Sequence, residues 1–286
     1  MLGRNYGDYP GDPELKRTLA RRQRVFWDSN LGAYVQADLG DWSCRQHYFK
    51  GVYHDRIVPL LIDALLSDGG TFIDIGANRG IHTLHAARVL RGRGRVLAFE
   101  PNPATFDVLR AHLTINQISH CTTFNMGLAA EAGELRLNSF ADDHSGTCSF
   151  VESGAVTASV SVPVRRLDDV LAADELAGPV LVKIDVEGFE HEVLRGMEQT
   201  LRRNDLAVVC EVTDEWLRKT GSSAAGLIEH LTSRGFRGRL PRVRYVSLLR
   251  EGLELHELRE IPEGPQFDAV FAREGLLAGR FAGGRR

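Results

Sequence analysis

Two short motifs place acidic and small residues where strands of a parallel sheet are expected to end. The first, Asp74-Ile-Gly76-Ala-Asn78-Arg-Gly80, follows an apolar run and precedes a helical pattern. Small residues let the backbone approach a ligand there, and a helix N-terminus offers free N–H groups to a carboxylate. The second glycine of a dinucleotide fingerprint is missing, and Asp74 would repel a pyrophosphate but accept from an ammonium group. A zwitterionic amino-acid ligand is therefore favoured; the alternative is a turn that serves packing alone.

Glu100 ends the next expected strand. An acidic residue at this place can accept hydrogen bonds from both hydroxyls of a ribose. A methionine-like zwitterion and a ribose at neighbouring strand ends together indicate S-adenosylmethionine. The alternative for Glu100 is structural, a carboxylate stabilised by the dipole of the helix that begins at Pro101. In the cofactor interpretation, Glu100 binds the ribose, and the adenine lies beside Asn125 and Met126. The methionyl end is held by Asp74, Gly76, Asn78, Gly80 and Thr83.

The second motif, Lys183-Ile-Asp185-Val-Glu187-Gly-Phe-Glu190, lies at the end of a buried strand. Lys183 and Asp185 face the same side because side chains alternate along a strand. Central parallel strands are usually apolar on both faces, so a lysine and an aspartate here indicate a site at the carboxyl edge of the sheet. Glu211, on the neighbouring strand, is expected near Asp185. The structural alternative is a buried ion pair, with Glu187 capping the following helix.

Strand and helix patterns alternate along the chain around these motifs. Apolar residues recur at helical spacing after Asp55, and helices are also expected after Gly80, after Pro101, over 190–201 and over 224–234. This alternation implies right-handed crossovers and a Rossmann-like, doubly wound, seven-stranded and mostly parallel sheet. The expected strands are 71–75, 95–100, 122–125, 180–185 and 206–212, with peripheral strands at 134–137 and 159–164 and a closing antiparallel pair at 242–249 and 267–272.

Five segments carry a family resemblance. They are Phe-Ile-Asp-Ile-Gly-Ala-Asn-Arg-Gly (72–80), Ala-Phe-Glu-Pro-Asn-Pro (98–103), Leu-Thr-Ile-Asn (113–116), Arg-Leu-Asp-Asp-Val-Leu (166–171) and Val-Lys-Ile-Asp-Val-Glu-Gly-Phe-Glu (182–190). Over roughly 70–235 the chain resembles the FkbM family of S-adenosylmethionine-dependent methyltransferases. The resemblance implies a class I methyltransferase fold and methyl transfer, usually to a hydroxyl of a secondary metabolite or a sugar. The chain's two ends lie outside it, and we expect substrate choice to reside there.

A hydroxyl acceptor must lose its proton as the methyl group arrives. His144, in a polar loop, could be the general base, although a lone histidine can equally be ordinary surface. Asp185 could take this role if burial raises its pKa, or Asp185, Glu187 and Glu211 could hold a divalent ion. Because Lys183 would place a competing cation beside Asp185, we prefer the metal-free route, with His144 as base and Asp185 orienting acceptor or cofactor.

Composition restricts the remaining possibilities. The 286 residues are 43% hydrophobic and 26% charged, which excludes a disordered chain, and the formal net charge of −3 makes nucleic acid an unexpected partner. Cys44, Cys121, Cys148 and Cys210 show no C-x-x-C spacing, so neither a zinc site nor a disulfide framework is indicated. The absence of a secretion-signal pattern and of any long apolar run predicts a cytoplasmic protein that does not act in a membrane.

The domain division follows the change of pattern near Asp55. Residues 1–56 are rich in aromatic side chains, with a helical stretch expected over 13–27, and form either a cap packed on the core or a lid over a ligand. Residues 57–274 are the expected methyltransferase domain, and 275–286 a flexible tail.

Two rival functions remain open. An RNA methyltransferase is suggested by the arginines after the last expected helix (Arg234, Arg237, Arg239, Arg242 and Arg244), and the other rival is a non-catalytic scaffold with a cofactor-binding fold.

Overall fold

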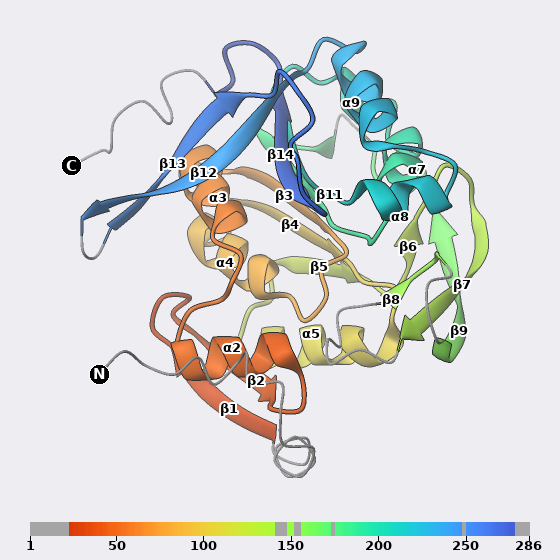
Figure 1. Ribbon diagram of the computed structural model, residues 1–286. Coiled ribbons are helices and arrows are strands. Elements are labelled where there is room, and N and C mark those ends of the chain that lie inside the picture. Colours follow the sequence, from red (N-terminus) through yellow and green to blue (C-terminus); the bar gives the residue numbers. More distant parts are fainter. Residues whose placement is uncertain (1–22, 141–147, 152–155, 173–174, 248–249, 278–286) are drawn as a thin grey trace.

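An eight-stranded sheet lies at the centre of the computed structural model (Figure 1), which describes residues 23–140, 148–151, 156–172, 175–247 and 250–277. The strand order is β13-β12-β14-β11-β10-β3-β4-β5. Neighbouring strands run parallel from β11 (Leu206–Val212) through β10 (Val180–Ile184), β3 (Gly70–Ile75) and β4 (Gly94–Phe99) to β5 (Cys121–Phe124). Antiparallel pairs add β14 (Phe267–Ala272), β12 (Arg237–Ser247) and β13 (Arg250–Glu257).

The prediction of seven strands was wrong by one strand, β13. The closing pair is antiparallel as expected, but β12 pairs with β14 only through residues 237–239. β12 then continues beyond β14 and returns as β13, so the two form a long hairpin. Among the described residues of β13, Leu253 and Leu255 are the ones that pack into the hydrophobic core beneath α3 and α4. Two apolar positions are too few for the sequence pattern to predict a separate strand.

Helices cover both faces of the sheet, which confirms the doubly wound arrangement. On one face lie α3 (Ile57–Leu66), α4 (Ile81–Leu90) and α5 (Pro103–Ile115), and on the other α7 (Glu190–Arg195), α8 (Asp214–Lys219) and α9 (Ala224–Thr232). Phe72 packs with the side chains of α3 and α4, whereas Ile73 and Ile75 pack with those of α7, α8 and α9. Strand alternation therefore decides which side of the sheet each residue of β3 contacts.

The helix expected over 190–201 is shorter than predicted. α7 ends at Arg195, and a 3-10 turn, η2 (Thr200–Arg202), follows. Gly196 lies between them, where an added Cβ would come within 2.1 Å of the Ala129 carbonyl oxygen. The backbone of Ala129 thus approaches Gly196 closely at the point where α7 ends. A short helix, α6 (Leu167–Val170), precedes β10, and helix α8 was not predicted.

The expected peripheral strands form a second sheet. It has four strands in the order β6-β9-β7-β8, made by β7 (Gly133–Phe140), β9 (Val156–Arg165), β6 (Gly127–Leu128) and β8 (Cys148–Ser149). This sheet lies beside the carboxyl end of β5 and supplies one wall of the site described below.

A hairpin and a helix form the N-terminal cap, defined here as residues 23–56. Strands β1 (Gln23–Asp28) and β2 (Ala33–Asp38) pair antiparallel, and α2 (Trp42–Lys50) follows. The helix expected to extend to Trp27 is therefore a strand from Gln23 onwards, because its β-forming side chains pair with the alternately buried β2. The rest of that prediction, and most of the expected tail, lie outside the described residues.

Hydrogen bonds fasten the cap to helix α5. The Tyr34 backbone N–H donates to Asn116 Oδ1 at 2.7 Å, and Asn116 Nδ2 donates to the Tyr34 carbonyl at 2.8 Å. The Gln36 N–H donates to His112 Nε2 at 2.7 Å. The Asn116 side chain thus pairs with β2 as a neighbouring strand would.

Within the described ranges, no helix combines the length and apolar character that crossing a membrane requires.

Candidate active site

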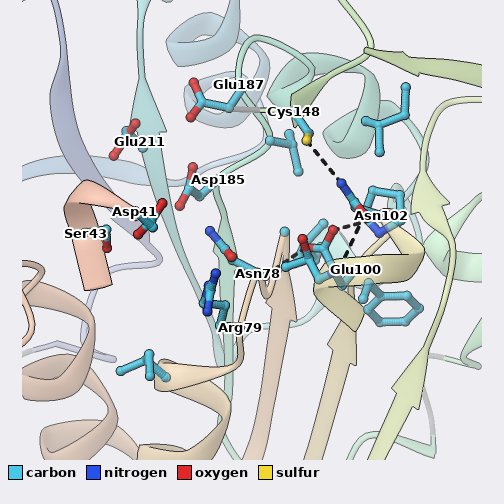
Figure 2. A pocket seen from close by; sticks show the side chains of 18 of the residues that line it. Asp41, Ser43, Asn78, Arg79, Glu100, Asn102, Cys148, Asp185, Glu187 and Glu211 are labelled. Carbon is cyan, nitrogen blue, oxygen red and sulfur yellow. Dashed lines mark hydrogen bonds between the residues drawn. The ribbon is translucent and has the colours of Figure 1, made fainter. Parts of the chain in front are cut away.

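A cavity of about 560 Å³ opens at the carboxyl ends of the parallel strands, where ligands bind in open α/β sheets. Its walls come from the turn after β3, the end of β4, the segment after β5, the ends of β10 and β11, and the cap (Figure 2). Of the sequence-predicted site residues, those that line it are Gly76, Asn78, Glu100, Met126, Asp185, Glu187 and Glu211.

Glu100 projects from the end of β4 and is held by backbone donors. The N–H groups of Asn78 and Asn102 each donate to one of its carboxylate oxygens at 2.8 Å. Burial raises its pKa to about 7. The N-cap of α5 is Asn102, whose side chain accepts from Ala104 and Thr105. Glu100 thus lies next to the helix start, as its structural alternative has it, and its carboxylate also lies in the cavity wall, where the cofactor interpretation places it.

Asp74 lies behind the cavity wall rather than in it. It is the register partner of Lys183 on β10 and lies on the sheet face that α4 covers. Thr83 Oγ1 donates to Asp74 Oδ2 at 2.6 Å, and Lys183 Nζ lies 3.6 Å from Asp74 Oδ1. Both Asp74 and Thr83 are fully buried. Both side chains therefore lie behind the cavity wall, and their assignment to the methionyl end of the cofactor stays a prediction.

Gly80 and Asn125 are also in supporting positions. Gly80, with φ of +79°, begins α4 with Leu109 packed against its Cα. Asn125 Nδ2 donates to the backbone carbonyls of Glu100 and Pro101 at 2.9 and 3.1 Å. These contacts fix the two turns that carry Asn78 and Glu100 into the cavity.

Lys183 connects the two motifs beneath the cavity. Its Nζ donates to the Gly76 carbonyl at 2.9 Å and lies 3.1 Å from Asp185 Oδ2. The carboxylates of Asp185 and Asp74 hold the pKa of this buried lysine above its ordinary value despite its burial. The buried ion pair named as the structural alternative is thus present, and it lies directly beneath a site that opens to the cavity.

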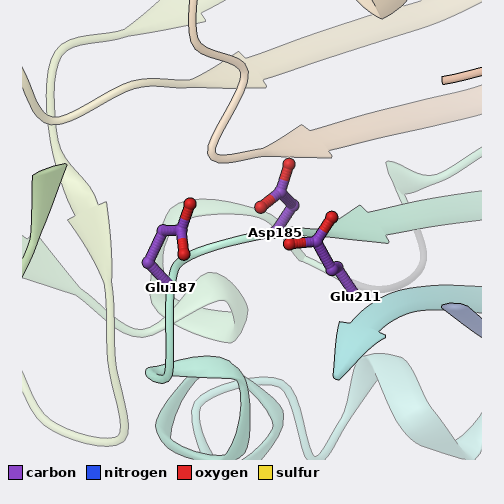
Figure 3. Close-up of side chains that lie close together, drawn as sticks. All are labelled: Asp185, Glu187 and Glu211. Carbon is purple, nitrogen blue, oxygen red and sulfur yellow. The ribbon is translucent and has the colours of Figure 1, made fainter. Parts of the chain in front are cut away.

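Three carboxylates converge at the ends of β10 and β11 (Figure 3). Carboxylate oxygens of Asp185, Glu187 and Glu211 all lie within 4.8 Å of one another, and we call this set the acid cluster. The prediction that Glu211 lies near Asp185 is therefore confirmed. Oxygen donors in this arrangement are of the kind that Mg²⁺ or Ca²⁺ takes, so these residues are the ones that could hold a metal.

Repulsion within the acid cluster favours protonation of its glutamates. Burial, with Asp185 and Glu190 nearby, raises the pKa of Glu187 to about 8. Burial, with Asp185 and Glu187 nearby, raises the pKa of Glu211 to about 9. These carboxyl groups therefore bind protons near neutral pH, when an ordinary glutamate has lost its proton.

Backbone geometry after β10 places Glu187 in the acid cluster. Glu187 has φ of +52°, an uncommon value for a residue with a side chain, and Gly188 packs against Trp216 so closely that a Cβ would lie 2.8 Å from it. The Glu190 carboxylate accepts from the N–H groups of Val186 and Gly188 at 3.3 and 3.1 Å. Glu190 therefore stabilises the turn before α7, and the N-cap of α7 is Phe189, so the structural alternative, Glu187 as the cap of this helix, is wrong.

His144 lies outside the described residues, so its role as general base stays a prediction. Sequence reasoning missed several lining residues that come from the cap, from turns and from the unpredicted helix α8: Asp41, Ser43, His54, Arg79, Trp216 and Gln266.

The arginines that suggested an RNA partner are largely paired with glutamates. Arg234 Nη2 lies 2.7 Å from Glu198, Arg237 lies 2.9 Å from Glu274, and Arg244 lies 2.9 Å from Glu254. Three of the five charges are therefore balanced locally, which weakens the case for a polyanion-binding surface.

A family model described as the methyltransferase FkbM domain matches residues 74–237, which contain both motifs of the site. This chain belongs to the FkbM methyltransferase family. A protein named methyltransferase 1 from Beauveria bassiana is 32% identical over 167 residues, which span 52% of this chain and 66% of that protein. A hexuronic acid methyltransferase, AglP, from Haloferax volcanii is 30% identical over 158 residues, 54% of this chain and 60% of that protein.

A solved structure of an FkbM methyltransferase from Methylobacillus flagellatus aligns with 90% of this chain and 58% of its own at 16% identity, with a TM-score of 0.44.

Proposed function

We propose that this chain is an S-adenosylmethionine-dependent O-methyltransferase whose acceptor is a hydroxyl group of a small molecule or a glycosyl unit. One observation carries the proposal: Glu100 and the acid cluster open into the same cavity. A buried carboxylate suited to a ribose and a set of carboxylates suited to receiving a proton thus share one enclosed space. In domain terms, we assign catalysis to residues 57–274 and closure of the cavity to residues 1–56.

The residues present fit this cofactor. Glu100 can accept from ribose hydroxyls while its own charge is stabilised by two N–H donors. Asn78 Oδ1 is buried in the wall and has no hydrogen-bond partner among the described residues, so a ligand donor would satisfy it. Apolar side chains that would enclose an adenine follow β5 and β8, namely Met126, Leu128 and Phe150. When bound, S-adenosylmethionine supplies a methyl group on a sulfonium, for which the protein need provide no covalent chemistry.

The acid cluster would receive the acceptor's proton. Glu187 and Glu211, with pKa values raised to about 8 and 9, are stronger bases than an ordinary carboxylate once they are ionised. Asp185, fixed by Lys183 at 3.1 Å, would orient the acceptor hydroxyl. Lys183 already supplies a positive charge beneath the acid cluster, which supports the metal-free route. His144 remains the rival base.

A glycosyl or polyol acceptor suits the far side of the cavity. Trp216 lines the cavity with the acid cluster, and the three carboxyl groups offer polar partners for hydroxyl groups. The similarity to a hexuronic acid methyltransferase supports a sugar acceptor, and the family membership supports methyl transfer.

The decisive test follows a labelled methyl group. The full-length protein is incubated with methyl-labelled S-adenosylmethionine and a metabolite extract of its host, with and without exhaustive chelation. We expect labelled products whose methyl group is on oxygen, formed at the same rate in both samples. A rate lost on chelation and restored by Mg²⁺ would move the acid cluster to metal-ligand roles, and absence of any product despite cofactor binding would support the scaffold alternative.

A further inference from the structure

His112 lies on helix α5 against the cap and is not among the described residues that line the cavity. Its side chain is 1% exposed, and both of its ring nitrogens have a backbone partner. The Gln36 N–H of β2 donates to Nε2, and Nδ1 lies 2.7 Å from the Arg79 carbonyl oxygen. Because Nε2 accepts, the ring proton is on Nδ1, which donates to Arg79. One buried imidazole thus forms a bridge from the cap to the turn between β3 and α4.

The bridge requires an uncharged imidazole. A protonated ring carries donors on both nitrogens and cannot accept from the Gln36 N–H. Burial, together with the nearby charge of Arg79, holds the pKa of His112 below its ordinary value. The ring is therefore neutral near pH 7, and its two hydrogen bonds fix a single tautomer.

The turn that receives this bridge also holds the carboxylate that we assign to the ribose. Asn78, the residue before Arg79, donates its N–H to Glu100 at 2.8 Å. Asn78 has φ of +49°, an uncommon value for a residue with a side chain, so contacts around the turn must hold this conformation. The hydrogen bond from His112 to the Arg79 carbonyl is one such contact. Hydrogen bonds therefore lead from the cap through His112 to the turn that positions Glu100.

We propose that His112 is a positioning residue that couples docking of the cap to binding of the cofactor. It acts through Gln36, which lines the cavity from the cap, and through the turn that carries Asn78. A cofactor that fixes this turn strengthens the attachment of the cap, and by the same free energy a docked cap favours the cofactor. The coupling rests on the proposed function and deepens it, because it makes closure of the cavity depend on the cofactor.

Asn116, one turn further along α5, provides a matched comparison. It also fastens the cap, through its two hydrogen bonds with Tyr34, and its side chain makes a third bond to the His112 carbonyl. Among the described residues, none of its hydrogen bonds reaches the turn after β3. A variant at Asn116 therefore loosens the cap and leaves the bridge in place, which separates coupling from simple attachment.

Hydrogen–deuterium exchange at the Gln36 amide measures the coupling in the full-length protein, with and without S-adenosylhomocysteine. In wild-type protein we expect the ligand to slow this exchange at least about fivefold, the lower end of typical couplings between sites. His112→Asn keeps a donor near the position of Nδ1 and loses the acceptor for Gln36, whereas His112→Gln keeps an acceptor near the position of Nε2 and loses the donor for Arg79. Each variant breaks one half of the bridge, so the ligand should change the exchange by less than about twofold in both.

Asn116→Ala is the control. It should speed exchange at the cap in the absence of ligand, and the ligand should still slow exchange at Gln36 at least about fivefold. Calorimetry shows that each variant binds S-adenosylhomocysteine and is therefore folded. Because the two His112 variants break the bridge at opposite ends, either one suffices if the other does not fold.

The outcomes distinguish the coupling from the function on which it rests. Wild-type protein that does not bind S-adenosylhomocysteine refutes the proposed function and the coupling with it. Wild-type protein that binds the ligand without slower exchange at Gln36 refutes the coupling alone. So does equal slowing in the His112 variants, which would show that the ligand protects the cap by direct contact, and so does loss of the ligand effect in Asn116→Ala.

Discussion

Two groups of carboxylates line the same cavity in different electrostatic settings. Glu100 is surrounded by donors, because the N–H groups of Asn78 and Asn102 both point at its oxygens. Glu187 and Glu211 in the acid cluster are surrounded by other acids, with Lys183 beneath Asp185 as the compensating charge. Burial raises the pKa of all three glutamates, but only in the acid cluster does repulsion from neighbouring carboxylates add to it substantially.

The two electrostatic settings suit different roles, ligand binding for Glu100 and proton transfer for the acid cluster. A carboxylate that receives two backbone hydrogen bonds keeps a fixed orientation and can bind a neutral diol without changing its own charge. Carboxylates that repel one another hold protons near neutral pH and release or accept them readily when a ligand enters. Under the proposed function, the end of β4 would bind the cofactor, and the ends of β10 and β11 would exchange protons with the acceptor.

The largest effect is expected from removing a proton acceptor. Glu211→Gln preserves the shape of the side chain but cannot take a proton, so kcat should fall by about 10²-fold or more while S-adenosylhomocysteine affinity stays within about threefold. Steady-state kinetics with calorimetry measures both. Glu254→Gln, an exposed glutamate paired with Arg244, is the control. A large loss for His144→Ala with none for Glu211→Gln would transfer the role of base to His144.

A smaller effect is expected on the binding side. Glu100→Ala removes hydrogen bonds to a charged group worth about 1.5–3 kcal/mol, so S-adenosylhomocysteine affinity should fall about tenfold or more. Because the pKa of Glu100 is raised to about 7, wild-type affinity should also weaken as the pH falls through that value and the carboxylate becomes protonated. Calorimetry across this range measures the effect. Affinity that is unchanged in folded Glu100→Ala contradicts the ribose assignment.

The smallest effect concerns stability. A glutamate whose pKa is raised on folding binds a proton that the unfolded chain releases near pH 4.5, so its contribution is greatest at low pH and is lost as the pH rises. For Glu211 this loss occurs between about pH 4.5 and 9. The melting temperature should therefore fall from pH 6 to pH 9, and by a few degrees less in Glu211→Gln, which cannot ionise. Parallel curves for the two proteins would show that the acid cluster is not destabilised by its own charge.

Local sequence patterns suffice to predict the parallel core and much of the site. Strand–helix alternation predicts the doubly wound sheet, and residue parity on one strand predicts that Lys183 and Asp185 share one face. Both follow from local periodicity, which an isolated stretch of sequence contains. The position of Glu100 at a strand end belongs to the same class of prediction.

Which residues reach the cavity depends on packing between segments that are distant in the chain. Asp74 lies on the same sheet face as Lys183, but α4 covers that face at its position, so Asp74 contacts Thr83 of α4 and does not line the cavity. That covering is not a property of the segment. Asp41 enters the wall because β2 pairs with the side chain of Asn116 and docks on α5, a contact between segments distant in the chain. Glu187 joins the acid cluster through a left-handed backbone conformation, in a turn where the next residue, Gly188, packs against Trp216. Long-range packing fixes such positions, and sequence spacing carries no record of it.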